Sequence, residues 1–392
     1  MINPYSGIDL QSVERVWSVS HQHLSHSSQS AAQSAYNTIY STGVRHFPVV
    51  QYRPSLVPAY SYADNVLKYT AKPIPSDATI ADIKADCQYD VTIDNDAICG
   101  PNAEHVYPYL YLDNAWYKWT NVHINGLGSE FESGLVRVDG SFSDAGLLCP
   151  YSEGITNILT RLKYPDGGGV IINHPKWTVD NTHKSFDMAR FIEDCLDYDE
   201  RVLGTDIIES GIQTRLDYDI TLADTILSTG RRCWLFCQGD WNQTRGRNEL
   251  LIPAGLSRAE QEYACLKAYR DGAFFGRYAN SDLSITSIGF SNGTFTLTAA
   301  NADGIKVYID GTETDYTGTS VSVTVPSSAK YVRAMAYINR DDDPDWTYDE
   351  GDVYKDLVFT NPIMVNERTY KYDPAYDVVK TQTDSFPVWF WG

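Results

Sequence analysis

The chain has 392 residues, of which 43% are hydrophobic and 13% aromatic, enough to fill the cores of two or three domains. Its formal net charge of −20 at pH 7 argues against a broad surface for nucleic acid or anionic lipid. It holds no apolar run of about 20 residues and no basic segment followed by an apolar one at its start, so we expect a cytoplasmic protein without a signal peptide or membrane span.

Seven cysteines are scattered through the chain, and an odd, scattered set suits reduced thiols better than a disulfide framework. Cys233 and Cys237 lie four residues apart in an apolar run. We expect both in a buried strand; the alternative is a zinc or redox site.

Three of the eight histidines fall within residues 21–26, directly after an apolar segment that predicts a strand. In an extended chain His21 and His23 point to the same face, so both imidazoles can reach one cation at a strand end. His26 does not share that face. The Ser-rich residues that follow leave a polar surface loop as the alternative. Residues 28–42 then carry apolar positions at helical spacing and end before Gly43, which predicts a helix.

Between residues 13 and 280 the predicted strands and helices alternate. The last helix begins with a capping box at Ser257 and Glu260. The predicted strands are residues 47–50, 121–126, 170–174, 206–209 and 233–237, and the predicted helices are residues 153–163, 186–196, 222–227 and 257–269. Such alternation calls for a parallel sheet, open or closed into a barrel, with its chemistry at the carboxyl ends of the strands.

Composition changes near residue 280. From residue 283 to about 365, segments of period-two alternation are separated by Gly, Asn, Asp and Pro turns, which predicts an all-β sandwich of immunoglobulin size. Residues 367–392 show no period and end in an apolar, aromatic sequence. We expect this tail, with the sandwich, to contact the body, a protein partner or a second copy of the chain.

Several predicted strand ends carry a residue that can bind a metal. They are His21 and His23, Glu104 beside His105, His123, His174 and Asp240. Each has an ordinary alternative, such as a helix cap for a strand-terminal Asp or a turn residue for a His before Pro. The strand ends of a parallel α/β barrel meet on one rim. Five predicted strands that each carry a possible ligand at this end therefore favour a metal site. Mixed His and carboxylate ligands suit Zn, Mn or Fe.

Over about residues 13–280, the order of these residues resembles the PHP (polymerase and histidinol phosphatase) superfamily of metal-dependent phosphoesterases. The motifs that carry the resemblance are His21 to His23, Gly100 to Glu104, Asn121 to Gly128, Gly169 to Pro175, Asp206 to Glu209 and Gln238 to Asp240. Within the superfamily the chain is most similar to the CehA-like branch, in which a β-sandwich follows the barrel, and residues 359–365 resemble that branch's closing strand.

The resemblance implies an α/β fold with a distorted (β/α)7 PHP-type barrel over residues 1–280, a small all-β immunoglobulin-like sandwich over 281–366 and a C-terminal tail over 367–392. It also implies a first metal site and a second one that shares a bridging Glu104. The first site takes His21, His23, Glu104 and Asp240, and the second is completed by His123 and His174. The resemblance implies up to three divalent metal ions as cofactors, and Asp240 and His174 take catalytic roles. The implied reaction is hydrolysis of a phosphate mono- or diester of a small phosphorylated substrate by metal-activated water.

The chain departs from the family's pattern at the third metal. The family's second motif ends in Asp-His, but residues 50–53 hold neither, and Asn242 stands where the last motif has a His. Only His26 is left for a third ion, so we expect a one- or two-metal centre. Arg53 and Lys176 can supply fixed positive charge to a phosphate instead, the alternative being ordinary exposed basic side chains.

Two other functions stay open on the sequence alone. A catalytically attenuated barrel could act as a binding or structural protein, which the missing second motif favours. The same metals could also hydrolyse a non-phosphate ester or an amide.

Overall fold

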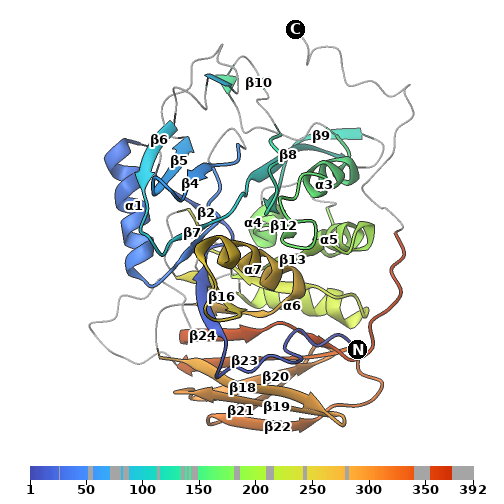
Figure 1. Ribbon diagram of the computed structural model, residues 1–392. Helices are drawn as coiled ribbons and strands as arrows, with labels where there is room; N and C mark the ends of the chain where they lie inside the picture. Colours follow the sequence, from blue (N-terminus) through green and yellow to red (C-terminus); the bar gives the residue numbers. More distant parts are fainter. Residues whose placement is uncertain are drawn as a thin grey trace.

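The computed structural model describes residues 1–25, 27–51, 56–70, 81–82, 88–112, 115–133, 137–138, 141–142, 149–180, 186–208, 216–241, 245–278, 282–339 and 354–372. Two large sheets carry most of these residues (Figure 1). The C-terminal strands form a layer at the bottom of the view, below the helices. In the described part of the chain, no helix is long and apolar enough to cross a membrane.

The larger sheet has ten strands and joins both ends of the chain. In spatial order its strands are β21 (Thr312–Thr317), β20 (Gly304–Ile309), β23 (Tyr331–Asn339), β24 (Tyr354–Thr360), β17 (Phe274–Tyr278), β16 (Gly246–Ile252), β1 (Glu14–Ser18), β3 (His46–Phe47) and β7 (Ile98–Cys99), with β25 (Ile363–Met364) paired to β23. Only the β1–β3 and β3–β7 pairs of this sheet are parallel among the described strands.

The second sheet has five strands and carries most of the helices on its faces. In spatial order its strands are β14 (Trp234–Cys237), β13 (Val202–Ile208), β12 (Gly169–Ile172), β9 (Ala115–Leu127) and β8 (Glu104–Leu112). The first three are parallel, whereas β9 is antiparallel to both β12 and β8. The helices are α3 (Tyr151–Leu159) before β12, α4 (Pro175–Asp180) and α5 (Met188–Tyr198) between β12 and β13, and α6 (Leu216–Ser228) between β13 and β14.

Four small sheets complete the described strands. β2 (Gln22–His23) pairs in parallel with β15 (Asp240–Trp241). The other small sheets are β4 (Ala59–Ser61), β5 (Val66–Thr70) and β6 (Gln88–Thr92); β10 (Arg137–Val138) and β11 (Ser141–Phe142); and β18 (Ser284–Ser291), β19 (Thr294–Ala300) and β22 (Ser320–Thr324). Two further helices are α1 (Gln29–Ser41) and α7 (Arg258–Asp271).

The closed (β/α)7 barrel expected from the sequence is wrong. Such a barrel needs parallel neighbouring strands, each followed by a helix on the outside. Here β8 and β9 form an antiparallel hairpin, and β16 pairs antiparallel with both β1 and β17. Through β17 and β24 the large sheet continues outward into the C-terminal strands instead of closing. The described helices accordingly form no ring around a closed sheet, and strands predominate over helices.

β16 and β17 are absent from the predicted strands for a physical reason. Both are buried along their whole length, so neither alternates, and buried polar residues such as Arg247, Glu249 and Arg277 interrupt the apolar run that marks a buried strand. Once these two strands are present, the apparent β-then-α repeat no longer describes the chain.

The C-terminal strands form two layers around an apolar core. The antiparallel sheet β18-β19-β22 contributes Phe295 and Leu297 to this core, and β20, β23 and β24 line its other side. β24 also pairs with β17, so the strand pairing is continuous across the expected boundary at residue 280. Arg333 of β23 forms a buried ion pair with Asp224 of α6, with 2.6 Å between Nη2 and Oδ2. The boundary stays a prediction, and residues 373–392 of the expected tail lie outside the described residues.

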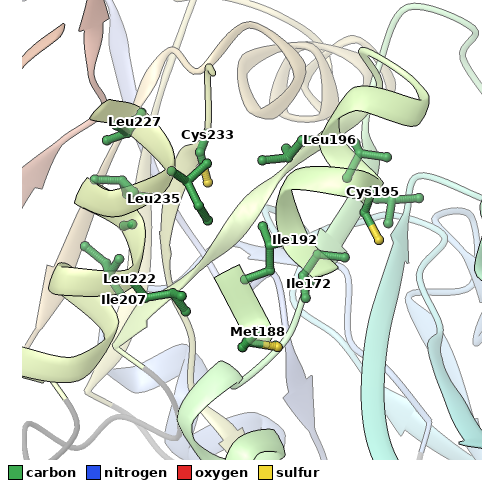
Figure 2. Packing of buried hydrophobic residues seen from close by; sticks show 14 of the residues in the cluster. Ile172, Met188, Ile192, Cys195, Leu196, Ile207, Leu222, Leu227, Cys233 and Leu235 are labelled. Carbon is green, nitrogen blue, oxygen red and sulfur yellow. The ribbon is translucent and has the colours of Figure 1, made fainter. Parts of the chain in front are cut away.

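The largest apolar core packs α5 and α6 against β12, β13 and β14 (Figure 2). Cys233 and Cys237 are fully buried in it, as expected from the sequence. Two predictions from local sequence signals are also confirmed. Helix α1 matches the helix predicted over residues 28–42, and the capping box at Ser257 and Glu260 begins α7. α7 ends at Gly272, whose φ of 74° lies in the left-handed region that glycine adopts without strain.

Candidate metal centre

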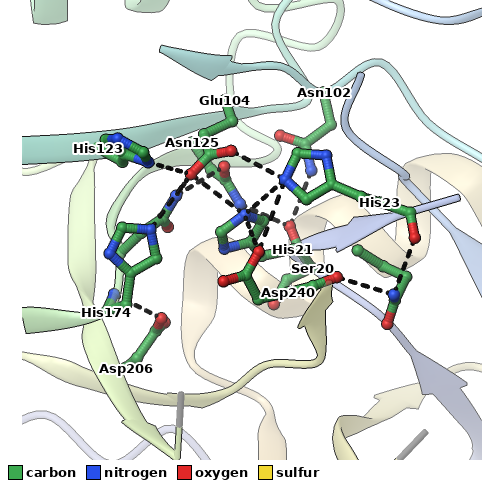
Figure 3. Close-up of polar contacts among 12 residues, drawn as sticks. Ser20, His21, His23, Asn102, Glu104, His123, Asn125, His174, Asp206 and Asp240 are labelled. Atoms are coloured by element: carbon green, nitrogen blue, oxygen red, sulfur yellow. Dashed lines mark hydrogen bonds and ion pairs between the residues drawn. The ribbon is translucent and has the colours of Figure 1, made fainter. Parts of the chain in front are cut away.

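Six side chains from several segments of the chain meet in one group, with the carboxylate of one of them at its centre (Figure 3). They are His21, His23, Glu104, His123, His174 and Asp240. The two N-terminal histidines lie after β1 and in β2, the glutamate begins β8, and the next histidine lies on β9. The last histidine stands between β12 and α4, and the aspartate begins β15. All six were predicted from the sequence as strand-end ligands, and the fold brings all six together.

Glu104 lies at the middle of this group. Its Oε1 is 2.6 Å from His123 Nδ1 and 3.3 Å from His174 Nε2. The same oxygen is 3.3 Å from His21 Nε2, and Oε2 is 2.9 Å from His23 Nε2. Imidazoles therefore face both oxygens of this carboxylate. A carboxylate in that position can bridge two cations.

His21, His23 and Asp240 form the tightest set of donors on one side of Glu104. The two Nε2 atoms are 3.4 Å apart, and Asp240 Oδ1 is 3.5 Å from the first and 3.6 Å from the second. A tetrahedral ion with bonds of about 2.1 Å holds its ligand atoms about 3.4 Å apart. The spacing and the chemistry of these donors therefore fit a divalent ion. His21, Glu104 and His174 form a second group that could hold one.

Two of the six residues have a backbone in the left-handed region, where non-glycine residues are uncommon. His174 has φ 28° and Asp240 has φ 48°. The His174 amide donates to Asp206 Oδ2 at 2.9 Å, and the Asp240 amide donates to the His21 carbonyl at 2.8 Å. These hydrogen bonds hold the strained positions, from which His174 reaches Glu104 and Asp240 reaches the two N-terminal histidines.

Asparagine side chains fasten the segments to one another. Asn125 Nδ2 donates to the Ser20 carbonyl at 2.9 Å, and Asn102 Nδ2 donates to the same carbonyl at 2.8 Å. Asn173 Nδ2 donates to Asn125 Oδ1 at 3.0 Å and reaches Glu104 Oε1 at 3.5 Å. The residue that precedes the first histidine is thereby tied to β9 and to the loop before β8.

These supporting residues were not assigned a role from the sequence. A signal was present, because Asn102 and Asn125 each lie two residues from a proposed ligand, and Asn173 and Asp206 fall inside motifs that carry the family resemblance. Partners of metal ligands fix the orientation of the ligating groups.

The electrostatics of the group favour a positive charge at its centre. Burial raises the pKa of Glu104, but the charges of His21 and His123 outweigh burial and hold that pKa well below its usual range. Burial alone would lower the pKa of His21, but Glu104 and Asp240 raise it to about 9. Burial lowers the pKa of His174, which keeps its ring neutral and able to bind a cation. A proton or a metal ion would satisfy the two carboxylates.

The exposure of the six side chains is uneven. The side chains of His21 and His23 are 0% and 3% exposed, whereas His123 and Asp240 are 15% and 24% exposed. A small molecule would therefore approach past His123 and Asp240.

The remaining predicted site residues lie elsewhere or outside the described residues. Lys176 is on α4, two residues after the last histidine, with Nζ 5.1 Å from the centre of the Tyr218 ring. His26 and Arg53 lie outside the described residues. His105 is adjacent to Glu104 in sequence, but its ring lies 5.3 Å from that of Phe131, on the other face of β8.

Fold and site together define a class: a β-rich protein with mixed sheets and a buried His and carboxylate cluster of metal-ligand spacing. Comparisons with protein-family models, with curated proteins and with solved structures find no significant match to this chain. The interpretation of the site therefore depends on its own geometry.

Proposed function

We propose that this protein is a metal-dependent hydrolase that cleaves a phosphate mono- or diester. The observation that carries the proposal is the convergence of four imidazoles, from distant segments, on the carboxylate of Glu104, with Asp240 beside two of them. The order of the motifs, which resembles that of the PHP superfamily, supports phosphate-ester chemistry. The closed barrel of that family is no part of the proposal.

Two neighbouring positions are proposed for divalent ions, with Glu104 shared between them. His21, His23 and Asp240 complete the first, and His123 and His174 complete the second. Imidazole and carboxylate donors favour Zn, Mn or Fe. When bound, such ions would lower the pKa of a water molecule and stabilise negative charge on phosphoryl oxygens.

The chain's own residues have separate tasks in this proposal. Asp240 is the most exposed of the six side chains, so its carboxylate is placed to orient the attacking water and accept its proton. His174 stays neutral, and its backbone N–H donates the hydrogen bond to Asp206 that holds its position. Lys176 follows on α4 and would add fixed positive charge for the phosphate. A cytoplasmic location, as expected from the sequence, completes the proposal.

Metal content and hydrolysis test the proposal in one set of samples. The full chain is purified without chelator, its metals are measured by elemental analysis, and hydrolysis of p-nitrophenyl phosphate and bis(p-nitrophenyl) phosphate is followed. We expect one or two ions per chain and hydrolysis that a chelator abolishes. Glu104→Gln should lower the rate about 100-fold or more, since even groups that merely support metal ligands are worth about 10–100-fold.

His105→Leu is the matched control. It changes the neighbouring residue of β8, whose buried ring contacts Phe131 and none of the six side chains of the centre in the described contacts. Metal content and rate should therefore stay at wild-type levels. Protein that carries no metal would contradict the proposal. Stoichiometric metal with neither ester hydrolysed would favour the attenuated, metal-containing binding protein instead.

A further inference from the structure

Trp177 of α4 lies directly against the proposed second metal position. Its ring centre is 4.8 Å from that of His174, in an edge-on arrangement, and 5.2 Å from that of His123. The side chain is half-buried. Sequence analysis assigned no role to this residue.

The indole brings apolar surface to the two imidazoles that it contacts. Among the described residues, Trp177 belongs to none of the four apolar clusters, whereas Val179 of the same helix packs against the largest one. A large aromatic ring that contacts two polar imidazoles keeps apolar surface beside a polar site. Such a combination is typical of ligand pockets, where aromatic walls flank a few polar groups.

The indole also contacts one of the more exposed side chains of the centre. His123, which it contacts, is 15% exposed, while His21 on the inner side is 0% exposed. Next to it, Lys176 lies over the ring of Tyr218 and extends the same surface from α4 to α6. A phosphate held at the centre would therefore have an aromatic surface at its side.

We propose that Trp177 is the wall that binds the organic group of the substrate, and that this group is flat and aromatic. The substrate class is then an aromatic or nucleoside phosphate ester rather than a compact aliphatic one. The inference depends on the proposed function, because it assumes that the phosphate binds at the metal centre. Aromatic contacts contribute up to about 1.5 kcal/mol beyond area burial, which corresponds to roughly a tenfold change in affinity.

Binding of two non-hydrolysable phosphonates tests this independently of catalysis. Full-length protein loaded with Zn²⁺ or Mn²⁺ is titrated by calorimetry with phenylphosphonate and with methylphosphonate. Wild type should bind the phenyl compound about tenfold more tightly. Trp177→Leu should remove this preference and leave methylphosphonate affinity and metal content unchanged, and Trp177→Phe should retain most of it. Tyr263→Leu, which removes an aromatic ring of α7 that contacts Tyr164, is the control and should change neither affinity.

The outcomes separate the two levels of the proposal. If wild type binds both phosphonates with equal affinity, or if Trp177→Leu lowers both affinities equally, the proposed role of Trp177 is wrong. The proposed phosphate-binding centre is not contradicted by either result. If the metal-loaded wild type binds neither, the proposed function itself fails. If Trp177→Leu loses metal or fails to fold, Trp177→Phe is the deciding variant. If Trp177→Phe retains metal and its preference for phenylphosphonate is reduced, the aromatic wall is supported. If Trp177→Phe also loses metal, the role of Trp177 is structural.

Discussion

Glu104→Gln should remove more metal than any single histidine substitution, because Glu104 is the only one of the six side chains shared by both proposed positions. The amide has nearly the same size as the carboxylate, so packing is conserved. What is lost is a negative charge that lies 2.6–3.3 Å from four imidazoles. His123→Ala, in contrast, removes one donor from one position and should leave the other ion bound.

The expected loss of stability follows from mass action. An ion present at 100 times its dissociation constant stabilises the native chain by about 2.7 kcal/mol, and one present at its dissociation constant by about 0.4 kcal/mol. If the substitution weakens binding about 100-fold, the chain loses about 2.3 kcal/mol for each ion. With an unfolding entropy of about 2.1 cal/mol/K per residue, a 392-residue chain that unfolds in one transition should melt about 3 °C lower for each ion lost.

Calorimetric melting with added metal and with chelator measures this difference. In chelator a smaller gap should remain, because the carboxylate of Glu104 also stabilises the imidazoles around it, whose charges hold its own pKa well below the usual range, and added metal should widen this gap. Equal metal loss from His123→Ala would refute the bridging role of Glu104. An equally large gap in chelator would show that the carboxylate matters for folding rather than for metal.

Three further predictions concern the scaffold. Burial lowers the pKa of His46 to about 3, so only the unfolded chain takes up a proton at this residue as pH falls below about 6.5. The free energy of unfolding in chelator should therefore decline by up to about 2 kcal/mol between pH 7 and 5. His46→Asn should reduce this pH dependence, as measured by urea titrations. Arg333→Leu leaves the buried carboxylate of Asp224 without its guanidinium partner and should lower the free energy of unfolding by about 3–5 kcal/mol, with metal content unchanged. A loss of less than about 1 kcal/mol would contradict a buried ion pair. Residues 1–280 alone should retain metal, since all six ligands precede the boundary, but should aggregate because β17 loses β24; a soluble, metal-free fragment would refute the ligand set or the boundary.

The parts of the fold that could be predicted from sequence are those with local signals. α1, α5 and α7 show apolar periodicity or caps, and β12 to β14 are short apolar runs between turn residues. The topology could not be predicted in this way. The antiparallel pairing of β16 with β1 joins Glu14 to Ile252, and no local pattern records such a partner. The barrel was inferred because the parallel order of strands such as β12, β13 and β14 was extended to all the predicted strands.

The candidate site could be predicted further than the fold, because its residues carry chemistry. A histidine or carboxylate directly after an apolar run is conspicuous in a sequence. The residues that hold the ligands in place are not, since their roles depend on distant partners. Asn125 binds the carbonyl of a residue 105 positions away, and Trp177 is recognisable only from the two imidazoles that it contacts.

The proposed metal centre does not need a closed barrel, because residues of two sheets meet there. His21 and His23 follow β1 of the large sheet, whereas Glu104, His123 and His174 come from the five-stranded sheet. Asp240 follows β14, and the parallel pair β2–β15 brings it beside the first two histidines. Ions held between these ligands would join the two sheets as well as activate water. Metal binding and native packing should then be coupled, so that removal of metal loosens the contact between the sheets and not only the catalytic groups.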